Sequence, residues 1–231
     1  SSQERHAELS GTDTLDTRNN LALALRDLGE LDEALAILRH TLDRKRAAYG
    51  AIKPDHPEIL TTRHNIGRVL ADLGRLDEAD SELLPALAAR ERELGPNHAA
   101  TLTTQLAVAD VLRRRGDEAS LAEATRILTR LLDSLTERGI DHDALGQSVR
   151  ACVAACYNAT SRFAEAEIEA RKASEDAALM LGRENWITAD LQRELANALV
   201  GLGRVAEADA LLSPSLAVLE RQLGPAHWRT A

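Results

Sequence analysis

The chain has 231 residues, of which 44 % are hydrophobic but only 2 % aromatic, so a core must be built from Leu, Ala, Ile and Val. Leu and Ala are strong helix formers, and the composition therefore predicts an all-α fold. The net charge is −9, and the chain lacks the lysine tracts and paired aromatic residues on which phosphate and base contacts depend, so we expect no nucleic-acid ligand.

Residues 14–28 form the first expected helix, because Leu21 and Leu25 stand four residues apart on one face. Gly29 is expected to end this helix, since glycine accepts the left-handed conformation of a helix end. A second helix is predicted to start near Asp32, whose carboxylate complements the positive end of the helix dipole, and to end at Gly50. The segment therefore predicts two helices joined by a tight turn.

The same pair of helices recurs along the chain. The dipeptide Glu-Ala returns at steps of 45, 45, 42 and 42 residues, and such a period is typical of stacked supersecondary units. The extra residues of the longer steps lie around residues 51–53 and 119–121, at turns, where added length costs little. The units are expected at about 14–55, 56–97, 98–141, 142–184 and 185–226, with partial repeats at 1–13 and 227–231. The first helices are expected to end at Gly29, Gly74, Gly116, Ser161 and Gly203, and the second at Gly50, Gly95, Gly139, Gly182 and Gly224.

Small residues recur at two positions of the repeat, where paired helices must touch. A small side chain at both positions lets the helices approach closely, and extra volume there is expected to cost about 1–3 kcal/mol. The first-helix position holds Ala22, Gly67, Ala109, Ala154 and Ala196, and the second-helix position holds Ala34, Ala79, Ala124, Ala166 and Ala208.

Two prolines, Pro85 and Pro214, occupy one position inside the second helices of the second and fifth units. An interior proline removes a backbone hydrogen bond and costs about 3 kcal/mol. We therefore expect a kink in both helices, with the carbonyls of Ser81 and Ala210 deprived of their usual donors.

These motifs resemble those of tetratricopeptide repeats, and the period is similar to that of the 42-residue kinesin-light-chain-like subtype. The resemblance covers nearly the whole chain, although the chain has few of the aromatic residues of that family. It implies a right-handed α-α superhelix of five helical hairpins plus partial end repeats, which holds a peptide in a concave groove. The matching motifs are Asn20-Leu21-Ala22, Gly29, Leu31-Asp32-Glu33-Ala34 and the linkers Gly95-Pro96-Asn97-His98 and Gly224-Pro225-Ala226-His227.

Histidines and cysteines are expected to be structural. A zinc site needs converging ligands, whereas the recurring histidines stand singly in successive linkers, so we predict no metal and no cofactor. Cys152 and Cys156 are interpreted as core residues. The sequence contains no phosphate-binding loop, nucleophile elbow or partnered nucleophile, and we therefore predict no enzymatic activity. The recurring histidines are His56, His98, His142 and His227.

The sequence also leads to expectations about the cellular compartment and about the two ends of the chain. Two cysteines provide no disulfide framework, which favours a reducing cytoplasm. No apolar run is long enough to cross a bilayer, and residues 1–11 lack the layout of a signal peptide, so no membrane partner is expected. The richness in Ala, Leu and Arg is similar to that of high-GC bacterial proteins. Residues 8–11 resemble the end of a repeat and residues 227–231 the start of one, so we expect a fragment of a longer protein.

The candidate binding face is the inner side of the first helices, where positions recur at i, i+4 and i+7. This face carries four arginines on a protein of net charge −9, together with asparagines, which hold an extended backbone by donating and accepting together. The candidate residues are Asn19, Asn20, Arg26, His64, Asn65, Arg68, Arg113, Asn158, Arg193 and Asn197.

Two interpretations of this face stay open. Either its arginines grip the carboxylates of an acidic peptide, or they pair with Asp16, Asp72, Asp110 and Asp190 and only solvate the array. For the whole chain we predict a protein-interaction scaffold, similar to the sensor arms of signalling proteins. The alternatives are a regulatory arm that packs against an NTPase or DNA-binding domain of the same longer protein, and a self-association module, monomeric or weakly dimeric through the apolar faces of its end repeats.

Overall fold

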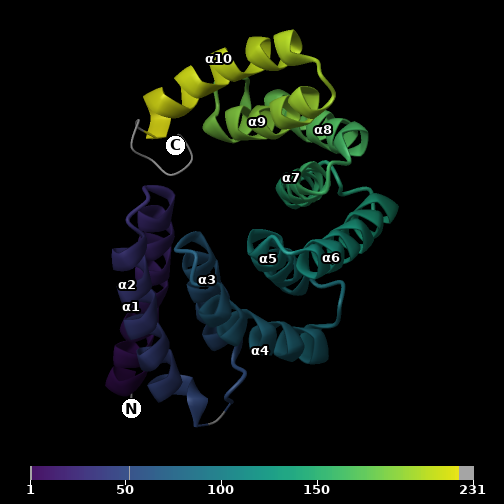
Figure 1. Cartoon of the computed structure of the whole chain (residues 1–231). Coiled ribbons are helices and arrows are strands. Elements are labelled where there is room, and N and C mark those ends of the chain that lie inside the picture. Colours follow the sequence, from purple (N-terminus) through teal and green to yellow (C-terminus); the bar gives the residue numbers. More distant parts are fainter. Residues whose placement is uncertain (1, 52, 224–231) are drawn as a thin grey trace. The chain divides into compact units, whose positions relative to one another are not determined.

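The computed structural model describes residues 2–51 and 53–223, with side chains from residue 15 onward. Its regular structure there consists of ten α-helices and one π-helical turn, which confirms the predicted all-α fold of helical hairpins (Figure 1). None of these helices is both long and apolar enough to span a membrane. The elements are α1 (Ser2–Asp27), α2 (Leu31–Lys45), η1 (Arg46–Gly50), α3 (Pro57–Asp72), α4 (Leu76–Leu94), α5 (Ala99–Arg115), α6 (Glu118–Glu137), α7 (Ala144–Ala159), α8 (Phe163–Leu181), α9 (Trp186–Gly201) and α10 (Val205–Leu223).

The chain divides into two compact units, Ser1–Val111 and Leu112–Ala231. In unit 1, α1 packs on α2, α2 on α3 and α3 on α4. In unit 2, each helix from α6 to α10 packs on the next one along the chain. Residues 2–13, which the sequence suggests as a partial repeat, continue α1, whereas residues 224–231 lie outside the described residues.

The first helices end in left-handed residues, as predicted. Ser161 has a φ of 59° and takes the place that glycine holds in the other units, such as Gly29 with a φ of 86°. The backbone N–H of Arg162 donates to the carbonyl of Tyr157 at 2.8 Å, which closes the helix end in the usual way. The sequence alignment of Ser161 with the glycines is therefore confirmed.

The helical segment that begins with α2 ends at Gly50 as predicted, but this glycine does not adopt the left-handed conformation expected of it. The last residues of this helix widen into the π-helical turn η1, and Gly50 is not among the glycines with positive φ. Ala51, which follows, also keeps a right-handed φ of −69°. The linker is longer here than after the second unit, so the chain leaves the helix gradually and needs no left-handed reversal.

The small residues lie where the helices of each hairpin meet, and all ten are buried. In α3, Gly67 packs directly against Leu83 of α4, because a Cβ atom at Gly67 would lie 2.4 Å from the Leu83 Cγ. That approach explains why this unit has glycine where the other four have alanine. The predicted close packing is confirmed.

Both proline-containing helices continue through the proline. The carbonyl of Ser81, which loses its backbone donor at Pro85, accepts a hydrogen bond from Nη2 of Arg63 at 3.0 Å. The corresponding residue of the fifth unit, Gln192, accepts a hydrogen bond from the Ser215 hydroxyl of α10 at 2.7 Å. A polar side chain of the first helix thus contacts the proline helix in both units.

Candidate functional site

The candidate face of unit 1 is built on two neighbouring first helices. α1 supplies Asn19 and Arg26, and α3 supplies His64 and Arg68. The repeat places Asn19 and His64 at one position of successive helices, because they are one 45-residue step apart. The structure brings the two arginines close to His64, since the charges of Arg26 and Arg68 both lower the pKa of His64.

Arg26 is neutralised within the protein. Its Nε donates to Oδ2 of Asp72 at 2.6 Å, and both side chains are largely buried. This pair is one of those that the second interpretation of the face predicts. A buried, hydrogen-bonded ion pair satisfies both charges, so Arg26 is not available to a ligand without breaking it.

Arg68 differs from Arg26, because among the described residues it makes no hydrogen bond and no ion pair. Burial and then the charge of Arg26 lower the pKa of Arg68 to about 10, against the opposing charges of Asp72, Asp27 and Asp110. A half-buried guanidinium with five donors and no acceptor is costly. Of the two predicted arginines of unit 1, it is the one that forms no ion pair with a described residue.

His64 lies one turn before Arg68 and is 8 % exposed. Burial, followed by the charges of Arg68, Arg90 and Arg26, lowers the pKa of His64 to about 3, so its imidazole is neutral at pH 7. Its buried Nδ1 atom has no hydrogen-bond partner. The neutral ring avoids adding another positive charge to a region that already holds several.

The asparagines of unit 1 are divided between interior and surface. Asn19 is buried, and its Nδ2 donates to the Thr62 hydroxyl at 3.2 Å while its Oδ1 has no partner. Asn65 is buried as well, whereas Asn20 is exposed. Buried polar atoms are normally paired, so the free Oδ1 of Asn19 and Nδ1 of His64 mark an incompletely satisfied region beside Arg68.

Sequence reasoning missed Arg90. This buried residue of α4 donates to the Ala100 carbonyl at 2.9 Å and to the hydroxyls of Thr104 and Thr61, all of which are neutral acceptors. Burial lowers the pKa of Arg90. The repeat could have indicated that this position is buried, because leucines, Leu135 and Leu219, occupy it in later units. Arg90 adds to the positive potential around His64.

In unit 2 the candidate residues are mostly paired or exposed. Nδ2 of Asn158 donates to the Glu194 carbonyl at 3.1 Å, and its buried Oδ1 has no partner. Nη2 of Arg193 pairs with Asp190 at 3.1 Å, as the second interpretation predicts, and Asn197 is exposed. Arg113 is half-buried and interacts with other residues. In unit 1, Asp16, another acid that the second interpretation names, pairs with Lys45.

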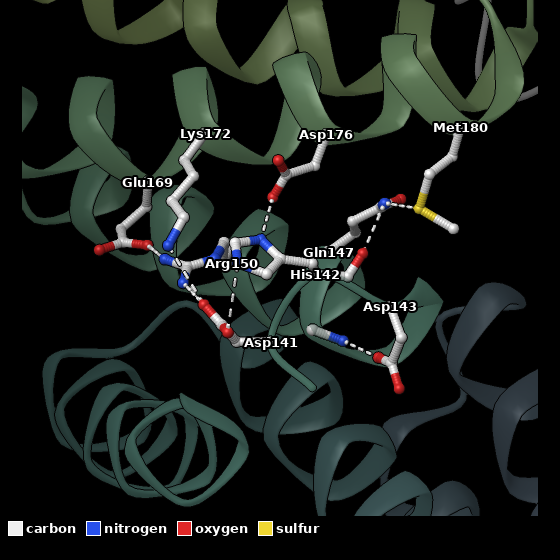
Figure 2. Close-up of polar contacts among 10 residues, drawn as sticks. Asp141, His142, Asp143, Gln147, Arg150, Glu169, Lys172, Asp176 and Met180 are labelled. Carbon is white, nitrogen blue, oxygen red and sulfur yellow. Dashed lines mark hydrogen bonds and ion pairs between the residues drawn. The ribbon is translucent and has the colours of Figure 1, made fainter. Parts of the chain in front are cut away.

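Figure 2 shows a polar network of unit 2 that the sequence did not reveal. The buried Arg150 of α7 pairs with Asp141 and with Glu169 of α8, both at 2.5 Å, and Lys172 pairs with Asp141 at 3.1 Å. Burial raises the pKa of Asp141, but hydrogen bonds from Lys172 and Arg150 outweigh it and lower this pKa to about 2. The charged groups of this network are paired with one another, so the network holds the linker residue Asp141 against the α7–α8 hairpin.

Two of the linker histidines cap helix starts. Nδ1 of His56 accepts from the Glu58 N–H at 3.3 Å, and Nδ1 of His98 accepts from the Ala100 N–H at 3.1 Å, so both cap helix starts. His142 instead contacts Asp176 at 3.1 Å (Figure 2), and His227 lies outside the described residues. Within the described part, no three potential ligands converge on a metal position.

The cysteines divide between core and partial exposure. Cys156 is fully buried, which confirms its interpretation as a core residue, and Cys152 is half-buried.

Comparisons with known proteins identify the family. Two models described as tetratricopeptide repeat match the sequence, one at residues 14–58 and 188–229 and the other at residues 58–120. The chain belongs to the tetratricopeptide repeat family. No curated protein matches the sequence.

Solved structures share the fold of this tetratricopeptide repeat (TPR) protein at low sequence identity. Kinesin light chain-like TPR repeats of Podosopora anserina match with a TM-score of 0.64 and 22 % identity, over 90 % of this chain and 96 % of theirs. BtubC (BKLC) from P. vanneervenii matches with a TM-score of 0.70 and 14 % identity, over 96 % and 86 %. Bacillus thuringiensis PlcR, solved with the peptide PapR7 and DNA, matches with a TM-score of 0.70 and 15 % identity, over 90 % and 70 %. TPR folds of this kind are generally non-catalytic scaffolds for protein interactions.

Proposed function

We propose that this TPR protein binds an acidic segment of a partner protein on the inner face of unit 1, with a carboxylate of that segment seated on Arg68. The observation that carries the proposal is the half-buried guanidinium of Arg68, which forms no hydrogen bond and no ion pair with the described residues. A carboxylate from a partner would accept two parallel hydrogen bonds from it. The partner thereby supplies what Asp72 supplies to Arg26.

The surroundings of Arg68 favour an anion over a cation. Arg26 and Arg90 lie close enough to lower the pKa of His64, and their charges attract a carboxylate although the whole chain carries a net charge of −9. Leu23, the counterpart of Arg68 in α1, is half-buried and offers an apolar contact beside it. These features suit a segment in which acidic and apolar side chains alternate.

Peptide binding by a TPR fold has a structural parallel in PlcR, which was solved with the peptide PapR7. In this function the protein changes no covalent bond and acts by holding its partner.

The test uses a defined probe, an acetylated and amidated peptide of alternating leucine and glutamate. NMR of the arginine side chains should show the Arg68 Nε resonance shifting on titration, and Arg68→Gln should abolish saturable binding. Arg75→Gln is the matched control, because Arg75 lies on an exposed turn and pairs with its own Glu78. Unchanged binding in Arg68→Gln, or equal loss in both variants, would contradict the proposal. Recovery of natural partners in a pull-down should likewise fall with the double variant Arg68→Glu, Arg193→Glu.

A further inference from the structure

Lys45 and Arg90 are two buried cations at one position of the repeat. Each follows the alanine of its Glu-Ala dipeptide, Ala34 or Ala79, by 11 residues. Lys45 is 1 % exposed and Arg90 is 5 % exposed. A buried charge is costly unless it is paired, so the partners of these two cations decide what each position costs. In the later units the same position holds the buried apolar residues Leu135, Ala177 and Leu219.

Lys45 is neutralised by two carboxylates. Its Nζ donates to Oδ1 of Asp16 at 3.0 Å and also to Oε2 of Glu58. Asp16 belongs to α1 and Glu58 to the first turn of α3, so the lysine ties the first hairpin to the second one. The position thus carries a buried cation whose charge is satisfied within the protein.

Arg90 lacks both of these carboxylates. Thr61 stands 45 residues after Asp16 and Ala100 stands 42 residues after Glu58, so the repeat puts these two neutral residues in the places of the two acids. Arg90 contacts both of them: its Nη2 donates to the Thr61 hydroxyl at 3.1 Å, and its Nη1 donates to the Ala100 carbonyl at 2.9 Å. Among the described residues it forms no ion pair, and burial lowers its pKa. The second hairpin therefore keeps the buried cation of the first without its two acids.

The surroundings of Arg90 favour an anion that comes from solution. Thr61 is exposed and Ala100 is half-buried, so solvent reaches both residues that replace the acids. Arg90 makes three hydrogen bonds within the protein, the third to Thr104, and a guanidinium has five N–H donors. The Thr61 hydroxyl accepts from Arg90 and keeps its own proton to donate. Ala100 lies in the first turn of α5, where the positive end of the helix dipole attracts negative charge.

We propose that Arg90 is the centre of an anion site for a small free oxyanion of the phosphate class, held between Thr61 and the first turn of α5. The ion takes the place that the carboxylates of Asp16 and Glu58 occupy around Lys45. Because Arg90 is only 5 % exposed, a small ion can approach it more closely than a side chain that is tied to the backbone of a bound protein. An oxyanion also offers several acceptor oxygens, so it can accept from the guanidinium and from the Thr61 hydroxyl at the same time.

Inorganic phosphate is the probe, added to the 231-residue protein at constant ionic strength with chloride as the balancing anion. It should raise the thermal unfolding midpoint to a plateau, because an ion that binds the native state stabilises it, and should shift the backbone amide resonances of Thr61 and Ala100. Arg90→Leu should weaken phosphate binding about tenfold or more, since its hydrogen bonds to a charged group are lost. Thr61→Asp supplies the carboxylate that Asp16 supplies to Lys45, so it should raise the midpoint without phosphate and abolish the further rise. Arg75→Gln, at an exposed ion pair, is the control and should keep the full phosphate shift.

The anion site does not rest on the proposed function, and Arg68→Gln separates the two. This variant should keep the phosphate shift, whereas its loss would place the ion at Arg68 and overturn the proposal. A phosphate shift that persists in Arg90→Leu or in Thr61→Asp would also overturn it, as would a wild type whose midpoint and amide resonances do not respond to phosphate. Circular dichroism checks that all variants keep their helical content, and leucine is already the residue of this position in two other units.

Discussion

His64 and Arg68 lie one turn apart on α3, and the charge of Arg68, after burial itself, holds the pKa of His64 near 3. Neither side chain has a hydrogen-bond partner among the described residues. The pair thus combines a neutral imidazole with a guanidinium that has no ion-pair partner, on the face that we propose binds an acidic segment. Its consequences can be measured in the free protein.

The first prediction concerns pH. The folded pKa of His64, about 3, lies below its ordinary value of 6.5, so below pH 6.5 the unfolded state binds the extra proton and the folded state does not. Stability from this group is therefore complete above pH 6.5 and falls by about 1.4 kcal/mol per pH unit as the pH drops toward 3. Urea unfolding at pH 7.5 and 5.5 should show that His64→Gln flattens this dependence. His40→Gln, at an exposed position, should leave it unchanged, and equal slopes in all three proteins would refute the prediction.

The second prediction concerns the network of Asp141. Asp141→Asn removes a carboxylate that Arg150 and Lys172 contact in the interior, and breaking a buried ion pair by removing one partner costs about 3 kcal/mol. The folded pKa of Asp141 lies below its ordinary value, so its contribution is present above about pH 4 and is lost as the pH falls toward 2. Urea unfolding at pH 7 measures the cost. Asp133→Asn, on the exposed side of α6, is the control, and a loss no greater than that of the control would show that the network contributes little.

The third prediction concerns the close approach of α3 and α4. Gly67→Ala should destabilise the protein by about 1–3 kcal/mol, although alanine is the better helix former, because its methyl group meets Leu83. In a Leu83→Ala background the space is free, and the same change should stabilise by up to about 1 kcal/mol. Thermal or urea unfolding of the four proteins of this cycle gives the coupling. The same sign in both backgrounds would mean that Leu83 is not the obstacle.

The fourth prediction concerns the donor that replaces a backbone N–H at Pro85. Arg63→Leu should cost about 1–2 kcal/mol, because it leaves the Ser81 carbonyl without a donor and removes the ion pair with Glu82. In a Pro85→Ala background a backbone N–H is again available to that carbonyl, so the cost should be smaller. Additive effects in this double-mutant cycle would show that Arg63 does not compensate for the proline.

Much of the fold could be predicted because its determinants are local. The recurring Glu-Ala dipeptide and the helix-ending residues set the helix pairs, and even Ser161 could be recognised from its spacing alone. The failure at Gly50 is local too: the sequence shows a glycine at the expected place, but the longer linker after it allows η1 to form. Glycine permits a left-handed conformation and does not require one.

The candidate face could be located from the sequence but not evaluated. Repeat spacing placed Arg26, Arg68 and Arg193 on one side of their helices, and nothing in that spacing distinguished them. In the structure, Arg26 and Arg193 have carboxylate partners, and Arg68 has none among the described residues. Arg90 was missed because it belongs to a second helix, and its hydrogen bonds to residues of α3 and α5 appear only in the structure.

The sequence by itself determined the family, the helix pairs and the positions of small residues, since all of these follow from a period that repeats along the chain. Only the tertiary structure decided which charges are satisfied and which apolar residues are covered. Ion pairs such as Arg26–Asp72 join residues 46 apart in sequence, and burial depends on what packs against a helix. Leu21 and Ile66 occupy the same position of the repeat, yet one is half exposed and the other buried, because only Ile66 has a preceding hairpin against it in the described structure.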